Sequence, residues 1–277
     1  MLALWSVAIL LTLAFLVWQK MSGPTYPVRA VLQLEGVRIP VELVRSGVID
    51  QDLPVKVEVI GAGKAGKDVS GRVVWRRYPT DDPWQTLPLE FKDGFLTGGL
   101  PPQPMAGKLE YRLEVTVGQS TGVVPGDGHA VARFKGPVPG LVLIFHVTFL
   151  VLGFLFSTAA GLEGLTKGPG LRTYSRLALG FLVVGGLMLG PIVQKYAFDA
   201  FWTGWPFGQD WTDNKLAVGA LLWLVAVWRT REAAPGHPRG RWYAVLAMVV
   251  IFVIFAIPHS IHGSTYDYAT GEHIQRM

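Results

Sequence analysis

The sequence predicts a mixed α+β membrane protein, with an N-terminal transmembrane helix, an extracytoplasmic β-sandwich and a four-helix transmembrane bundle. Half of the 277 residues are hydrophobic, only 16% are charged, and the mean hydropathy is positive, which sets the chain apart from ordinary soluble proteins. Five apolar runs of near-spanning length occur along it. Between the first two runs, about a hundred residues alternate between apolar and polar side chains, as half-buried strands do.

The first apolar run, residues 3–18, is uncharged and about long enough to cross a bilayer. A cleaved signal peptide is the rival interpretation, because the run is short and lies at the extreme N-terminus. The run lacks a basic leader, and no small-x-small cleavage site precedes Gln19-Lys20-Met21. We therefore expect residues 1–20 to be a retained anchor helix.

Residues 29–136 carry the signals of a sandwich. Short alternating runs are separated by turn clusters such as Asp81–Pro83 and Lys92–Gly94, which is the spacing of an antiparallel sandwich. The expected strands include Val31–Glu35, Val55–Val59, Arg72–Trp75, Tyr111–Val115 and Ala130–Phe134.

A proline-rich turn over Leu100–Pro104 precedes a tyrosine-bearing strand over Lys108–Leu113. In this the segment resembles immunoglobulin-like and fibronectin type III-like domains. The resemblance implies an immunoglobulin-like sandwich of about a hundred residues. It implies little about function, because such sandwiches host many unrelated functions.

Residues 138–277 predict four transmembrane helices, an outward loop over residues 194–215 and an outward C-terminal tail. The loops 163–176 and 229–241 are rich in Lys and Arg, so the positive-inside rule places them in the cytoplasm. The β domain is then outside and the N-terminus inside, which describes a multi-pass protein of the cytoplasmic (inner) membrane. Small residues at helical spacing predict close helix packing: Gly153, Ser157 and Gly161 in one span, and Gly186 and Gly190 in the next.

Three histidines suggest a cofactor site. His146 lies inside the apolar run 141–162, and an ionisable side chain at membrane depth is a functional candidate. His259 and His262 end the last run and share one helical face. Counted from the cytoplasmic ends of their helices, His146 and His259 each rise by roughly 26 Å. Two imidazoles at matched depth predict a bis-histidine haem b site near the outer surface.

The outward loop strengthens the haem hypothesis. Its section Ala197–Asp210 resembles the tryptophan-rich outward loop of the haem-handling membrane proteins of cytochrome c maturation. In that family the loop lies between spans and is flanked by outward-facing histidines that ligate haem. The resemblance implies that Trp202, Trp205 and Phe207 cover a haem. The alternative is an aromatic belt at the membrane surface, which needs no ligand.

Copper or zinc is the alternative cofactor. The chain has no cysteine, which excludes thiolate ligands, iron–sulfur clusters and covalent c-type haem attachment. Imidazole nitrogens and carboxylate oxygens remain as ligands. Thr212 or Asp213 is equally suited to capping the helix that follows. The candidate metal ligands are His259, His262, Asp210, Asp213 and Asp267.

Two function classes follow. The first is an electron-transfer or haem-handling membrane subunit. We favour a non-enzymatic or electron-transfer subunit over an enzyme, because neither a Ser/His/Asp arrangement nor paired carboxylates stand out, and the sequence leaves this question open. The second is a cofactor-free scaffold that docks a protein partner of a membrane complex through the β domain. In both classes the bilayer is a partner, and we expect no nucleic-acid binding, because the basic residues lie at the ends of apolar runs.

Overall fold

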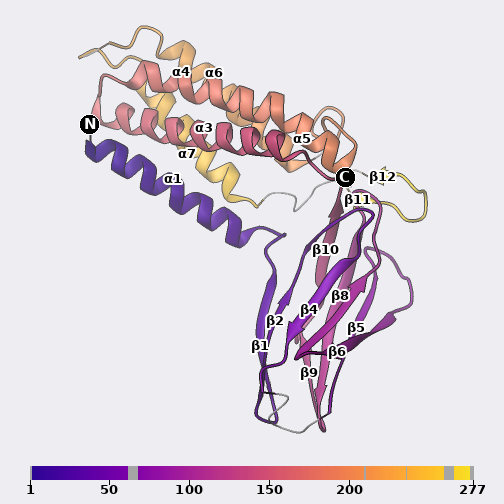
Figure 1. The fold of residues 1–277 in the computed structure, drawn as a ribbon. Helices are drawn as coiled ribbons and strands as arrows, with labels where there is room; N and C mark the ends of the chain where they lie inside the picture. The colour runs from indigo at the N-terminus through magenta and orange to yellow at the C-terminus, as the bar shows by residue number, and fades with distance from the viewer. Residues whose placement is uncertain (1, 62–67, 209, 235, 259–264, 275–277) are drawn as a thin grey trace. The chain divides into compact units, whose positions relative to one another are not determined.

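The computed structural model describes residues 2–61, 68–208, 210–234, 236–258 and 265–274. The chain divides into two compact units. The helical unit comprises Met1–Pro24, Val138–Ser264 and Gln275–Met277, and the β unit comprises Thr25–Pro137 and Thr265–Ile274. Figure 1 shows that the β unit interrupts the helical part of the chain after the first helix.

Most strands of the β unit belong to one hydrogen-bonded sheet. Its order is β3-β10-β8-β5-β6-β7-β4, with β9 paired to β8, while β1 and β2 form a separate hairpin. The strands are β1 (Val28–Leu34), β2 (Val37–Leu43), β3 (Ser46–Val48), β4 (Leu53–Glu58), β5 (Val69–Arg77), β6 (Gln85–Lys92), β7 (Phe95–Leu100), β8 (Lys108–Val117), β9 (Ser120–Val124), β10 (Ala130–Lys135), β11 (Thr265–Tyr266) and β12 (His273–Ile274).

The alternation of buried and exposed side chains explains how these strands pack. In β2, Val37, Ile39, Val41 and Leu43 are buried and the residues between them are not, so one face of the strand joins the core of the β unit. In β8, the buried Tyr111 donates a hydrogen bond from its hydroxyl to the carbonyl oxygen of Val44 at 2.6 Å. The β-sheet domain expected from the alternating runs is therefore present. Its finer assignment as an immunoglobulin-like sandwich stays a prediction.

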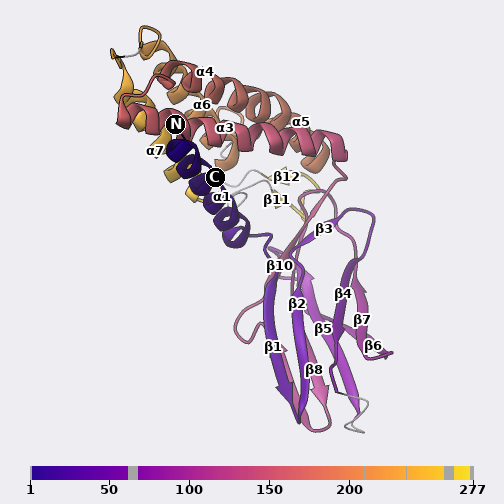
Figure 2. The same ribbon diagram turned by 60° about the vertical axis from the view of Figure 1, so that its left-hand side comes forward.

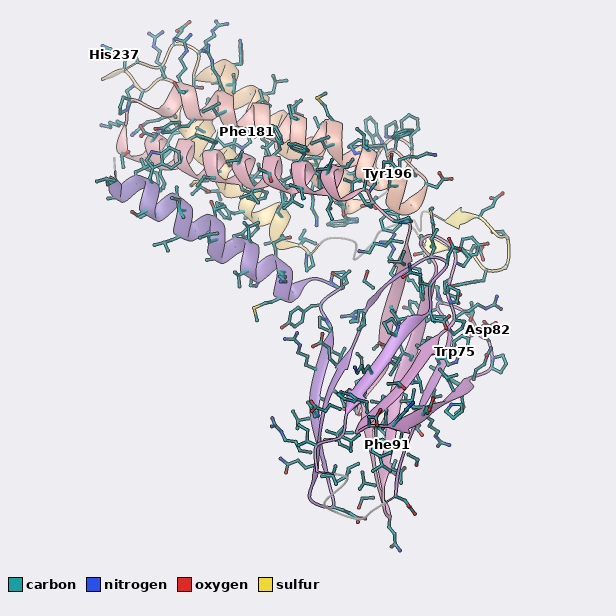
Figure 3. The ribbon with its side chains drawn as sticks, in the orientation of Figure 1. Trp75, Asp82, Phe91, Phe181, Tyr196 and His237 are labelled. Atoms are coloured by element: carbon teal, nitrogen blue, oxygen red, sulfur yellow. The ribbon has the colours of Figure 1, made fainter. Side chains whose placement is uncertain are left out.

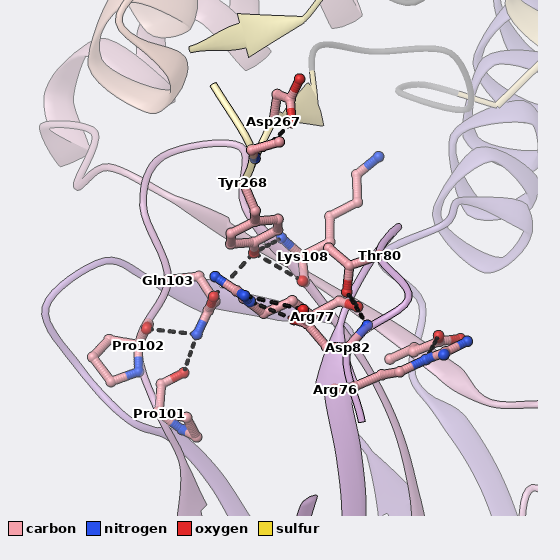
Figure 4. A network of polar contacts seen from close by, with 12 residues as sticks. Arg76, Arg77, Thr80, Asp82, Pro101, Pro102, Gln103, Lys108, Asp267 and Tyr268 are labelled. Atoms are coloured by element: carbon pink, nitrogen blue, oxygen red, sulfur yellow. Dashed lines mark hydrogen bonds and ion pairs between the residues drawn. The ribbon is translucent and has the colours of Figure 1, made fainter. Parts of the chain in front are cut away.

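The C-terminal hairpin β11–β12 belongs to the β unit, although about 130 residues separate it from β10. The Tyr268 hydroxyl accepts a hydrogen bond from the Lys108 amide at 2.9 Å and lies 3.0 Å from Gln103 Oε1 (Figure 4). The Arg77 guanidinium lies 4.9 Å from the centre of the Tyr268 ring. A Cβ at Gly107 would lie 2.9 Å from the Tyr268 oxygen, so this close approach favours glycine. These contacts hold the hairpin against the rest of the β unit.

The helices of the helical unit run side by side in both views, with α1 alongside α3 and α7 (Figures 1 and 2). Aromatic contacts fix α1: the Phe15 ring stacks 5.4 Å from Phe154, and the Trp5 ring lies 5.2 Å from Tyr174. The helices are α1 (Leu2–Ser22), α3 (Gly140–Thr166), α4 (Leu171–Leu182), the π-helical segment η1 (Val183–Met188), α5 (Leu189–Phe198), α6 (Trp211–Arg229) and α7 (Arg241–Ala256).

Three of the described helices are long and apolar enough to cross a membrane. They are α1, α3 and the continuous helix Leu171–Phe198 formed by α4, η1 and α5. The last two helices do not meet the same measure, because α6 carries Asp213 and Lys215 in its first turns and α7 has only 16 residues. The structure thus supports a membrane protein, and the complete four-helix transmembrane bundle stays a prediction.

Two boundaries differ from the sequence prediction. The second span of the predicted bundle begins at Leu171, so Arg172 and Arg176 are helical rather than part of a loop. The predicted outward loop 194–215 is narrower, because α5 continues to Phe198 and α6 begins at Trp211. In both places the sequence prediction assigns polar residues at a helix end to a loop.

The predicted close packing of small residues is confirmed. A Cβ at Gly153 would lie 3.0 Å from a Leu182 methyl group, one at Gly161 would overlap Met248, and one at Gly186 would overlap Leu216. Ser157 is fully buried in the same face of α3. Helices that approach this closely gain van der Waals contact, which is the main packing force in lipid.

We predict that Tyr268→Phe loosens the C-terminal hairpin. The change leaves the Lys108 amide without its phenolic acceptor, and such a loss costs about 1–3 kcal/mol. The measurement is proteolysis of the hairpin and thermal unfolding of the full-length protein in detergent. Tyr26→Phe is the control, because it removes only a 3.3 Å contact with the solvent-accessible Arg29. Equal protease resistance of wild type and Tyr268→Phe would contradict the docking role.

Docking of the hairpin should also depend on pH. Burial raises the pKa of the Tyr268 hydroxyl from 10.0 to about 12. Because the folded pKa is above the unfolded value, the stabilisation is complete below pH 10 and is lost as the pH rises through about 12. The unfolding temperatures of wild type and Tyr268→Phe should therefore converge over this interval. A constant difference at all pH values would argue against this linkage.

Candidate functional site

His146, in the second turn of α3, is oriented by one specific hydrogen bond. Its Nδ1 lies 2.7 Å from the carbonyl oxygen of Gly185. A carbonyl oxygen only accepts, so Nδ1 carries the proton, and Nε2 of the neutral ring keeps its lone pair. Nε2 has no hydrogen-bond partner within the part of the chain that the structure describes. The imidazole is thus held in one tautomer, with one nitrogen available to a ligand.

The partner carbonyl lies in the π-helical segment η1, in the middle of the span Leu171–Phe198. Hydrogen bonds in a π-helix run from i to i+5, and such segments are frequent at functional sites. Small residues give the ring its space, since a Cβ at Gly190 would already lie 3.7 Å from His146 Cε1. The local break in α-helical geometry and the half-buried imidazole therefore occur together.

A cavity of about 190 Å³ lies beside His146. The side chain of Phe255, near the end of α7, lines the same cavity. The matched depth of His146 and His259 stays a prediction, because His259 lies outside the described residues. Its polar lining comes from His146, Gln194, Asp210, Thr212 and Asp213, and its apolar lining includes Leu150, Val193, Phe198 and Leu216.

The loop over residues 199–210 is tied to this cavity by a buried carboxylate. Asp213 Oδ2 accepts hydrogen bonds from the Thr203 amide at 2.7 Å, the Thr203 hydroxyl at 3.2 Å and the Gly204 amide at 3.1 Å. Gln194 Nε2 donates to the Thr203 hydroxyl from the end of α5. Asp213 and Thr203 are both buried. We call Gln194, Thr203, Asp210 and Asp213 the loop clamp.

Asp210, rather than Thr212 or Asp213, caps α6. Its Oδ1 accepts a hydrogen bond from the Thr212 amide at 2.7 Å, as an N-cap side chain does. Asn214 accepts from the Trp205 amide at 2.7 Å and adds a further tie between helix and loop. The capping function expected of Thr212 or Asp213 therefore belongs to Asp210, and Asp213 holds the loop instead.

The aromatic side chains expected to cover a haem lie in the loop between α5 and α6. Trp205 and Phe207 are 77% and 76% exposed, and neither lines the cavity. Trp202 is half-buried and donates from Nε1 to the Trp205 carbonyl at 3.1 Å. This arrangement agrees with the alternative of an aromatic belt, in which rings project from the end of a helical unit toward an interface.

The predicted metal site stays a prediction, because two of its ligands are not among the described residues. His259 and His262 lie outside the described residues. Asp267 belongs to the β unit, where its Oδ1 accepts from the Ala269 amide at 2.8 Å, whereas Asp210 and Asp213 belong to the helical unit. No group of three or more His, Asp or Glu side chains suited to a metal ion occurs within the described part of the chain.

Three residues of the site were missed by sequence reasoning. Gly185 supplies the carbonyl for His146, and Gln194 and Thr203 complete the loop clamp. Gln194 carried a usable signal, because it is the first polar side chain after a long apolar run and faces the same end as the loop. A backbone carbonyl acceptor and a threonine hydroxyl carry no such pattern.

The volume of the cavity can be compared with the volumes of pockets that hold ligands. Pockets that enclose drug-sized ligands have volumes of about 300–1,000 Å³, and 190 Å³ lies below that range. The haem b hypothesis and the copper or zinc alternative both stay predictions. The polar groups that line the cavity are one imidazole, two carboxylates, one hydroxyl and one carboxamide.

Comparison with known proteins adds no assignment. No protein-family model matches the chain, and no curated protein matches it significantly.

We predict that Asp213→Ala releases the loop over residues 199–210. The change leaves the buried Thr203 and Gly204 amides without their acceptor, at a cost of about 1–3 kcal/mol for each. Hydrogen exchange of the full-length protein should show faster exchange at these amides. Asp199→Ala is the control, because Asp199 is exposed and its ion pair with Lys195 contributes at most about 0.5 kcal/mol. Unchanged protection in Asp213→Ala would refute the clamp.

Proposed function

We propose that this is a multi-pass membrane protein whose helical unit binds a transition-metal ion through Nε2 of His146. Copper would make it an electron-transfer subunit, and zinc a metal-handling one. The observation that supports this proposal most directly is the 2.7 Å hydrogen bond between His146 Nδ1 and the Gly185 carbonyl oxygen. Histidines that ligate metals almost always donate their other N–H to a carboxylate, carbonyl or water, which fixes the tautomer and raises the basicity of the ligating nitrogen.

Other groups support a metal beside this nitrogen. The carboxylates of Asp210 and Asp213 line the same cavity and would supply oxygen ligands or charge compensation. Lys215, one turn beyond the cap, donates from Nζ to the Ile257 carbonyl at 2.7 Å and so ties the end of α7 to α6. His259 and His262 follow Ile257 closely in sequence and are the chain's nearest sources of further imidazole.

The same features support a topology. The chain leaves the β unit at Pro137 and belongs to it again from Thr265. If the helices between them cross the membrane, the number of crossings must be even. The helices α3 and Leu171–Phe198 account for two crossings, so α6 and α7 either both cross or both do not. We propose that both cross, with α6 holding Asp213 and Lys215 in hydrogen bonds rather than exposing them to lipid. The His146 cavity then lies on the β-unit side, outside the cytoplasmic membrane, and the basic turns lie inside.

Haem b remains the second cofactor hypothesis. It shares Nε2 of His146 but requires a second imidazole and a larger cavity than about 190 Å³. Elemental analysis and absorption spectra of the purified protein distinguish haem b from a copper or zinc ion.

We predict that the detergent-purified protein contains copper or zinc in stoichiometric amount, and that His146→Ala loses it. Elemental analysis gives the metal, and absorption spectra of the oxidised and dithionite-reduced protein show any haem. His237→Ala is the matched control, because His237 is an exposed histidine at the far end of the same unit. A Soret band that disappears in His146→Ala would replace metal by haem. Full metal content in His146→Ala would disprove the proposed ligand.

A protein-docking scaffold is the alternative class, and one surface of the β unit favours it. Trp84 is exposed, its ring lies 4.4 Å from that of His129, and the Arg76 guanidinium lies 4.5 Å above it. Tryptophan and arginine dominate the energetics of protein interfaces. A protein with neither metal nor chromophore, expressed with both supplied, would favour this class.

A further inference from the structure

One end of the helical unit gathers seven lysines and arginines. The turn between α3 and α4 meets the start of α7 there, since a Cβ at Gly164 would lie 2.9 Å from the Arg241 carbonyl oxygen. Figure 3 shows His237 at this end and Tyr196 at the other. We define the basic end by these seven side chains: Lys167, Arg172, Arg176, Arg229, Arg231, Arg239 and Arg241.

Few of these charges are neutralised within the protein. Glu232 lies 2.8 Å from Arg239 and 3.7 Å from Arg231. The buried Glu163 accepts from the Gly170 amide at 2.8 Å and so holds the turn rather than a cation. Across the described residues, the other five basic side chains form no ion pair. The basic end therefore carries positive charges that can bind anions.

The central arginines stack on exposed aromatic rings. The Arg229 guanidinium lies 4.5 Å from the Trp228 ring and 5.0 Å from the Tyr243 ring, and the Arg241 guanidinium lies 4.5 Å from the Trp242 ring. Trp228 and Trp242 are 52% and 59% exposed. A stacked guanidinium is held by its face, which leaves its N–H edge free to bind an oxyanion.

Local backbone geometry brings these arginines together. Gly240 has a φ of +71°, and a Cβ there would overlap the backbone carbonyl of Arg229. Only glycine accommodates both conditions, so α7 starts directly against the end of α6. Arg229 and Arg241 therefore belong to one compact surface.

We propose that the basic end is a binding site for anionic phospholipids, with the phosphodiester at Arg229 and Arg241 and the tryptophan rings against the glycerol and upper acyl region. Charge complementarity selects an anion, and the exposed rings at the ends of apolar helices select a lipid over a free anion. Tryptophan at this level is suited to the headgroup boundary of the bilayer. The inference does not depend on the metal site at the opposite end.

The test is native mass spectrometry of the full-length protein in detergent, titrated with dioleoyl phosphatidylglycerol or dioleoyl phosphatidylcholine. We expect at least tenfold tighter retention of phosphatidylglycerol. Arg229→Gln combined with Arg241→Gln should reduce that preference by about fivefold for each removed charge. Lys20→Gln combined with Lys195→Gln is the charge-matched control, because Lys20 ends α1 and Lys195 lies beside the loop over 199–210, and it should keep the preference.

Two further arms keep the proposal testable if the double arginine variant unfolds. Raising the salt concentration should abolish the preference of the wild type, because charge governs it. Trp228→Leu keeps every charge and should weaken binding of phosphatidylglycerol without changing the affinity for glycerol phosphate alone. Equal retention of the two lipids by the wild type, or glycerol phosphate displacing the lipid at equal concentration, would overturn a lipid site.

Discussion

The architecture depends on one constraint, which is that the C-terminal hairpin is held on the β unit through Tyr268. The hydroxyl of this residue bonds with the Lys108 amide, and the Arg77 guanidinium covers its ring. If the helices between Pro137 and Thr265 cross a membrane, they cross it an even number of times. The apolar helices α1, α3 and Leu171–Phe198 make membrane insertion the physical context of that constraint.

From this constraint the two ends of the helical unit acquire different roles. The end that carries His146, the cavity and the loop clamp is the end nearest in sequence to the β unit, and there Thr203 and Asp213 are buried and hydrogen-bonded to each other. The other end carries unpaired arginines and exposed tryptophans. Buried, bonded polar groups suit a ligand that enters a cavity, whereas exposed, unpaired cations suit a charged surface. The two ends of the helical unit therefore differ in chemical character, which gives the unit a polarity along its axis.

Much of the fold was predictable from the sequence, because apolar runs and alternation are local patterns. The β-sheet domain and the apolar helices come from these patterns, and the small-residue contacts of Gly153 and Gly161 follow from spacing. The candidate site was less predictable. His146 stood out because charge is rare at membrane depth, but its partner Gly185 is a backbone carbonyl in a π-helical segment, which leaves no sequence signature. The docked hairpin has two-residue strands, too short for periodicity to reveal.

The most direct test of this polarity is single-cysteine labelling, since the chain has no cysteine of its own. Four full-length variants suffice: Asp127→Cys in the β unit, Thr270→Cys in the hairpin, Phe207→Cys in the loop and His237→Cys at the basic end. A membrane-impermeant maleimide applied to intact cells stripped of any outer membrane should label the first three, and label His237→Cys only after permeabilisation. Labelling of His237→Cys and Thr270→Cys from the same side would contradict the account.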